Sequence, residues 1–229
     1  MIGKKDIVVL ARSLIDQNPN TLRRPESYLQ HIEMTYDIAE QIVKNVLGHY
    51  PVIGLHPREV AGAAGLHDIG RPMQGDQTFH ELRGAQYIED HGVEKGVAPS
   101  ERQVSVIAQM VRPHAFVYEF WQDQACREKR KEFEPFDSVL LLPRTWQESI
   151  VAYADLSIGK GDKDGQRISV QERMRVLIDS YTRNPERADP AVARSVIKSE
   201  ERIFRLAKRV EALEQGRLSD RQIDRYGFL

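Results

Sequence analysis

Apolar residues recur along this chain at intervals of three and four, the spacing that places them on one face of an α-helix. No stretch shows the strict alternation of apolar and polar residues that is typical of a half-buried strand. The periodicity, with proline and glycine at the boundaries, predicts helices over residues 4–17, 25–47, 57–68, 80–91, 100–112, 145–158, 169–182 and 189–214. We therefore expect an all-α fold.

The segment 57–72 ends its predicted helix with an imidazole and a carboxylate side by side. His67 and Asp68 lie in the last turn, on the same helix face as small and apolar residues. Gly70 suits the left-handed residue just past a helix end, and Pro72 prevents the helix from continuing. An unpaired charge in a core is very costly, so the two side chains must pair with protein groups or hold a metal ion.

Three more histidines and one aspartate share helix faces with apolar residues. His31 continues the apolar stripe of the second predicted helix, and His114 extends the stripe of the fifth. His80 opens the fourth helix, where Gly84 lies one turn further on and allows another backbone or a ligand to come close. Asp155 lies on the inner face of the helix predicted over 145–158.

The inward-facing imidazoles and carboxylates form one candidate metal-binding set: His31, His67, Asp68, His80, His114 and Asp155. This donor chemistry suits divalent iron, manganese, nickel, cobalt, zinc or magnesium. Six ligands exceed what one ion needs if it must also keep positions for water and substrate. Two ions bridged by Asp68 would use them all, with His31, His67 and Asp155 on one ion and His80 and His114 on the other. A hydroxide between two metals about 3.5–4 Å apart is a strong nucleophile near neutral pH.

Composition narrows the class of protein. The chain has 229 residues, of which 41% are hydrophobic, and its 33 basic and 34 acidic residues leave a net charge of −1. That balance argues against nucleic acid as a partner. Cys126 is the only cysteine, which indicates a reducing compartment. No apolar run approaches the length of a signal peptide core or a membrane span, so we expect a cytoplasmic protein with no membrane partner.

The order of these residues resembles the HD-domain metal-dependent phosphohydrolase superfamily over about residues 26–182. The resemblance is carried by His67-Asp68-Ile69-Gly70, by His80-Glu81-Leu82-Arg83-Gly84-Ala85 and by Tyr153-Ala154-Asp155, with His31 and His114 in the family's order. The two extra histidines resemble its binuclear branch, which includes bacterial dinucleoside-tetraphosphate hydrolases. The resemblance implies an HD-type helical bundle over residues 1–182, one or two metal ions, and hydrolysis of a phosphate ester or anhydride, often of a nucleotide, by metal-bound hydroxide.

Two segments depart from compact members of that superfamily and leave the substrate open. Residues 115–142 are predicted to form an insertion with a helix and a mobile loop, and residues 183–229 a C-terminal helical extension. The apolar stripe from Val196 to Leu213 is expected to pack on the bundle, with a homodimer contact as the alternative. Two other functions use the same pocket: a di-iron oxygenase acting on a small organic substrate, and a non-catalytic sensor that binds a nucleotide.

Phosphate chemistry needs cations to neutralise the charge that develops on the transferred group. Arg71 directly follows the His67-Asp68 pair, so we expect it to orient phosphate and, with Asp68, to take part in catalysis. Four other basic residues lie near the predicted ligands in the sequence: Arg83, Arg112, Arg144 and Lys160. The remaining histidines stand beside glycine or proline in predicted loops and are expected at the surface: His49, His56 and His91.

Overall fold

The computed structural model describes the chain except for residues 75–76, 160–164, 184–188 and 225–229. Its α-helices are α1 (Lys4–Gln17), α2 (Pro25–His49), α3 (Pro57–Leu66), α4 (His80–His91), α5 (Glu101–Val111), α6 (Val117–Gln122), α7 (Arg127–Arg130), α8 (Trp146–Asp155), α9 (Val170–Arg183), α10 (Pro190–Glu214) and α11 (Asp220–Asp224). Among the described residues there is no sheet, only an isolated bridge between Ile158 and Arg167. The prediction of an all-α fold is confirmed.

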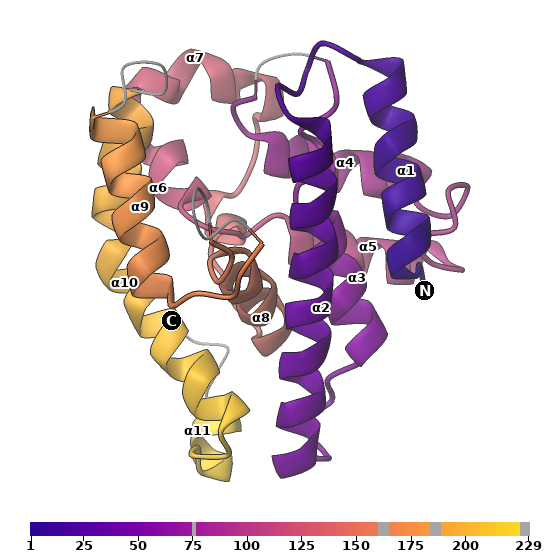
Figure 1. Ribbon diagram of the computed structural model, residues 1–229, viewed down its shortest axis with the longest axis vertical. Coiled ribbons are helices and arrows are strands. Elements are labelled where there is room, and N and C mark those ends of the chain that lie inside the picture. The colour runs from indigo at the N-terminus through magenta and orange to yellow at the C-terminus, as the bar shows by residue number, and fades with distance from the viewer. Residues whose placement is uncertain (75–76, 160–164, 184–188, 225–229) are drawn as a thin grey trace.

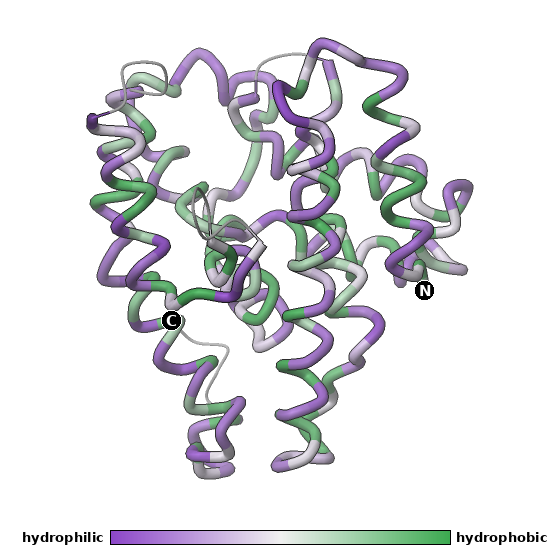
Figure 2. The backbone as a smooth tube through the Cα atoms, viewed as in Figure 1, coloured by the Kyte–Doolittle hydropathy of each residue, from purple (hydrophilic) through white to green (hydrophobic). Residues whose placement is uncertain are grey.

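The centre of the bundle is the short helix α3. Every residue from Val60 to Leu66 is buried, because alanine and glycine let α1, α2, α5 and α8 pack closely around it. In Figure 1, α1 and α2 lie at one edge, α9 and α10 at the opposite edge, and α8 between them. Hydrophobic and hydrophilic residues alternate along α2, α9 and α10 in Figure 2, as expected for helices with one buried face.

Proline and capping residues begin several helices where the sequence predicts. Pro25 and Pro57 are the first residues of α2 and α3, and a capping box between Thr145 and Glu148 begins α8. The end of α8 differs from the prediction, because the helix stops at Asp155 rather than at residue 158. Beyond this point the chain turns, and Ile158 pairs with Arg167.

The segment 115–142 contains more short elements than the single helix and loop that the sequence suggested. It forms α6, α7 and three 3-10 turns, η1 (Gln124–Cys126), η2 (Lys131–Phe133) and η3 (Ser138–Leu141). These short elements enclose a second, partly aromatic core: Phe79, Leu82, Val117, Phe120, Trp121, Cys126, Leu141 and Ala191. Ion pairs from Arg194 to Asp123 and from Arg202 to Glu119 attach the segment to α10.

The long helix α10 packs against α2, α6, α8 and α9. Its apolar stripe is part of the main core, with Val196, Ile203 and Leu213 each at most 1% exposed. The stripe therefore packs on the bundle, as expected. Within the described residues, none of the helices combines the length and the apolar character needed to cross a membrane.

Candidate metal centre

His67 and Asp68 lie just beyond α3 rather than in its last turn. The helix ends at Leu66, and His67 caps it in right-handed backbone geometry. The chain then tightens: the N–H of Ile69 donates to the carbonyl of Leu66 at 2.9 Å, and the N–H of Arg71 donates to that of Asp68 at 2.9 Å. This turn directs the imidazole and the carboxylate of the pair toward the same interior space.

Gly70 has a different role from the one expected. The described glycines with positive φ are Gly54, Gly96, Gly165 and Gly216, so the prediction of a left-handed Gly70 is wrong. A Cβ atom at Gly70 would lie 2.0 Å from the carbonyl oxygen of His80. Glycine is required here because the start of α4 passes against the turn.

Gly84 forms the other side of the same close contact. A Cβ on Gly84 would lie 3.0 Å from the backbone nitrogen of Gly70. The expectation that Gly84 lets another backbone approach is therefore confirmed. The two glycines bring His80, at the first turn of α4, next to Asp68.

Three side chains from distant segments form the first half of the centre. His31 Nε2 on α2 lies 3.2 Å from His67 Nε2 and 3.2 Å from Asp155 Oδ1 at the end of α8. His67 Nε2 lies 3.5 Å from the same oxygen of Asp155. Donor atoms that share one first-row ion at about 2.0–2.2 Å are about 3.0–3.5 Å apart. This set therefore has the composition and spacing to hold one metal ion.

The two carboxylate oxygens of Asp68 face different sets of histidines. Asp68 Oδ2 lies 3.6 Å from His67 Nε2 and 3.8 Å from His31 Nε2. Asp68 Oδ1 lies 2.8 Å from His80 Nε2 and 3.6 Å from His114 Nε2. The structure thus brings all six predicted ligands together, with Asp68 between the two groups.

Glu81 is a further candidate ligand that the sequence analysis missed. Its carboxylate is buried, with Oε1 at 3.8 Å from His114 Nε2 and Oε2 at 3.4 Å from His80 Nδ1. The group His80, Glu81 and His114 is compact enough to hold an ion. The only signal in the sequence was its position directly after His80, where a surface carboxylate in the first turn of a helix is equally common.

Backbone carbonyls fix the orientation of three of the imidazoles. The Nδ1 atoms of His67, His80 and His114 lie 2.7, 3.0 and 3.0 Å from carbonyl oxygens three residues earlier in the chain. A carbonyl only accepts hydrogen bonds, so each Nδ1 carries the proton. Each Nε2 then points at the cluster, where it can bind a metal ion once it carries no proton, as the histidine ligands of metals do.

The electrostatics of the centre favour cation binding. Burial alone would raise the pKa of Asp68, but Arg71 and the neighbouring histidines hold it well below the usual value. Burial also acts to raise the pKa of Asp155, and hydrogen bonds from His31 and His67 outweigh it and keep that pKa well below normal. Both carboxylates are therefore ionised at neutral pH.

His114 carries the opposite shift. Burial lowers its pKa, but Asp68, whose Oδ1 lies 3.6 Å from its Nε2, and the charge of Glu81 outweigh burial and raise the pKa to about 9. Without a metal ion, His114 is therefore protonated at neutral pH and helps to neutralise the carboxylates. A metal ion that binds its Nε2 must displace that proton.

Two of the described non-glycine residues adopt left-handed backbone geometry, and each is next to a candidate ligand. Phe79 precedes His80 with φ 58°, and Ala115 follows His114 with φ 46°. Such conformations cost about 1–2 kcal/mol and persist where the surroundings impose them. The ring of Phe79 is buried in the second core, and Arg202 donates to the carbonyl of Ala115 at 2.9 Å.

The centre lies in the wall of a cavity of about 820 Å³. Basic side chains line it: Arg23, Arg24, Arg71, Lys129 and Arg173. Arg71 Nε lies 2.5 Å from Asp68 Oδ2, so this expected cation is at the centre. Sequence reasoning missed the other four, because nothing in the periodicity separates an arginine in a cavity wall from one in water.

The other basic candidates lie elsewhere. Arg83 donates to the carbonyl of Thr78, and Arg112 pairs with Glu89. Neither of them nor Arg144 lines the cavity, and Lys160 falls outside the described residues. The three histidines expected at the surface are exposed, although each lies at a helix boundary rather than within a loop: His49, His56 and His91.

Comparison of the chain with known proteins identified no relative. No protein-family model, curated protein or solved structure matches the chain. The resemblance to the HD superfamily therefore remains a prediction from the order and spacing of the ligands in the sequence.

Proposed function

We propose that this protein is a metal-dependent phosphohydrolase of the HD type that cleaves a phosphate ester or anhydride, with a nucleotide as the expected substrate. The observation that carries the proposal is the position of Asp68. Its two oxygens face two separate groups of histidine ligands, in the wall of a cavity lined by basic side chains. A bridging carboxylate between two ion sites is the arrangement that two-metal hydrolysis requires.

The residues divide into two ligand groups. His31, His67 and Asp155 would hold one ion, and His80 and His114 the other, with Asp68 shared. Bound divalent ions would lower the pKa of a water molecule and polarise the oxygens of a phosphoryl group. The low pKa values of Asp68 and Asp155 keep both groups available as anionic ligands at neutral pH.

Arg71 would bind the phosphoryl group of the substrate. Its Nε pairs with Asp68 Oδ2, while 39% of its side chain is exposed and the residue lines the cavity. The ion pair holds the guanidinium beside the centre and leaves further N–H donors for a phosphoryl oxygen. A guanidinium suits this role because its planar donors match two oxygens of a phosphate.

The basic lining favours this proposal over the two alternatives. Five basic residues around the cavity favour an anionic substrate, which a phosphohydrolase always has and which an oxygenase acting on a small organic substrate does not require. A pure nucleotide sensor would need the basic residues but not a set of six metal ligands. An anionic substrate and a two-ion centre together account for both features.

The test combines elemental analysis of the purified protein with phosphate release from a panel of nucleotides, in the presence of Mn, Fe, Co, Ni, Zn or Mg. We expect about two ions per chain and turnover of at least one nucleotide. Asp68→Asn should lose both ions and all turnover, because Asp68 serves both groups. The control His49→Ala changes an exposed histidine and should retain both properties.

Two results would contradict the proposal. Bound iron with oxygen uptake on an organic substrate, and no phosphate release from any compound, would identify an oxygenase. Tight nucleotide binding without turnover under every metal would identify a sensor.

A further inference from the structure

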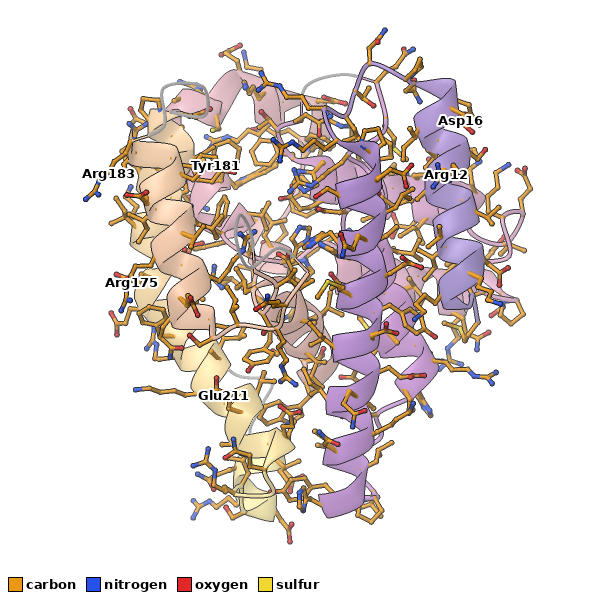
Figure 3. All side chains as sticks on the ribbon, viewed as in Figure 1. Arg12, Asp16, Arg175, Tyr181, Arg183 and Glu211 are labelled. Atoms are coloured by element: carbon orange, nitrogen blue, oxygen red, sulfur yellow. The ribbon has the colours of Figure 1, made fainter. Side chains whose placement is uncertain are left out.

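One face of α9 forms a wall of the cavity opposite the start of α2. Its residues follow the helical spacing i, i+3, i+4, i+7, i+8: Arg173, Val176, Leu177, Ser180 and Tyr181. Figure 3 shows Tyr181 on the inner side of α9, and Arg175 and Arg183 on its outer side. The only cationic residue on the inner face is therefore Arg173.

Arg173 is a buried cation without a hydrogen-bond or ion-pair partner among the residues that the structure describes. The residue is only 8% exposed, and its buried Nε atom has no hydrogen-bond partner among the described residues. Nothing in the described part of the chain forms an ion pair with it. Arg202 provides the contrast, since it pairs with Glu119 and also donates to the carbonyl of Ala115.

A buried guanidinium without a partner is energetically costly, so the position calls for an anion. Burial lowers the pKa of Arg173, and the charge of Asp155 only partly offsets that effect. Arg173 lines the same cavity as Asp155, Asp68 and Arg71, and the charges of all three act on it through space, so the guanidinium lies near the centre. An anion bound to Arg173 would therefore lie beside the prospective ligands.

The rest of the wall suits an organic group. Phe116 and Tyr181 both line the cavity, with their ring centroids 6.4 Å apart and their planes nearly perpendicular. Leu177 and Val176 add aliphatic surface on the same helix face. A ligand that is complementary to this wall has an anionic end near Arg173 and an apolar or aromatic part along α9.

We propose that Arg173 binds an oxygen of the substrate's phosphoryl group, with the organic part of the same molecule packed against Leu177, Tyr181 and Phe116. Calling this molecule the substrate rests on the proposed function, whereas the anion site at Arg173 does not. The ligand class is an organic phosphate with an aromatic or apolar group. Arg173 is then a substrate-binding residue supplied by α9, distinct from Arg71 beside the metal ligands.

The test uses inorganic phosphate as the probe, on full-length variants with matched metal content. Arg173→Met should weaken phosphate binding by about 10- to 100-fold, the range for loss of a hydrogen bond to a charged group. It should also raise the Tm of the phosphate-free protein, because it removes a buried charge that has no partner. Arg173→Lys keeps the charge without the planar fork, so its phosphate affinity should lie between those of Arg173→Met and the wild type.

Arg175→Met is the matched control, since Arg175 lies on the exposed face of the same helix. It should change neither phosphate affinity nor Tm. Wild-type phosphate affinity in both Arg173 variants would overturn the proposal, and so would a lower Tm of phosphate-free Arg173→Met, which would identify a structural arginine. Weakened phosphate binding in a protein that hydrolyses no nucleotide would support the anion site while refuting the proposed function. Nucleotide hydrolysis by Arg173→Met with a KM equal to that of the wild type would support the proposed function and refute the role of Arg173 in substrate binding.

Discussion

Asp68 Oδ1 lies 2.8 Å from His80 Nε2, and this contact joins the two ligand groups of the candidate centre. It depends on Gly70 and Gly84, where the turn after α3 touches the first turn of α4. The backbone of His80 occupies the space that a side chain on Gly70 would need. The geometry of the centre is therefore set by a backbone contact as well as by the ligands themselves.

Gly70→Ala should lower the free energy of unfolding by about 1–3 kcal/mol or more, because the new Cβ would overlap the carbonyl oxygen of His80. The same shift should displace His80 from Asp68 and weaken binding of the ion that they share. Urea denaturation and elemental analysis measure the two effects.

Gly48→Ala is the control for that substitution. A Cβ at Gly48, near the end of α2, meets nothing within 4 Å. Alanine there should be neutral or stabilise by about 0.5–1 kcal/mol, since it reduces the freedom of the unfolded chain. If Gly70→Ala behaves like this control, the close contact does not position the centre.

Glu81→Gln should lower the affinity for the metal ion at His80 and His114 and leave the affinity for the ion at His31 and Asp155 unchanged. The reason is that Glu81 contacts only the second group of ligands. Calorimetric titration of the metal-free protein with Mn should show one weakened site of two. Asp90→Asn, an exposed change on the same helix, is the control. Equal weakening of both sites would refute a specific role for Glu81.

Helical periodicity was sufficient to predict an all-α fold and to select the six side chains that the structure brings together. His31, His114 and Asp155 each continue an apolar stripe, so the pattern that buries the core also directs them inward. The ends of helices were less predictable. His67 and Asp155 lie at helix boundaries, where tertiary contacts rather than periodicity decide the last turn.

Other features depend on long-range contacts that a single sequence does not reveal. Gly70 resembles a helix-ending glycine locally, but its role comes from His80 in the next helix. Arg173 lies between the core residues Val170 and Met174 and follows no pattern of its own. The helices of segment 115–142 have 6 residues or fewer, which is too few to establish a helical period. Packing in the second, partly aromatic core holds them in place.

The metal affinity of the second ligand group, formed by His80 and His114 with Asp68, should rise with pH. The pKa of His114 is about 9 in the metal-free protein, so below that value a metal ion must displace a proton to bind Nε2. Apparent affinity should therefore increase by up to about tenfold per pH unit up to pH 9 and level off above it. Chelator competition between pH 6.5 and about 9.5 measures this slope. In His114→Gln the slope should be shallower, and an identical slope would show that another group carries the proton.

Arg202→Ala should destabilise the protein by about 1–3 kcal/mol, because it leaves the largely buried carboxylate of Glu119 without its partner. The side chains of this pair are 17% and 11% exposed, and the same guanidinium also holds the carbonyl of Ala115, next to His114. Chemical denaturation measures the loss, and metal titration should show a weaker second site, since the left-handed turn at Ala115 is no longer held. Arg183→Ala removes a pair whose arginine is 82% exposed and should cost no more than about 0.5 kcal/mol. If the two variants are equally stable, Arg202 does not attach segment 115–142 to α10 in the way that its hydrogen bonds indicate.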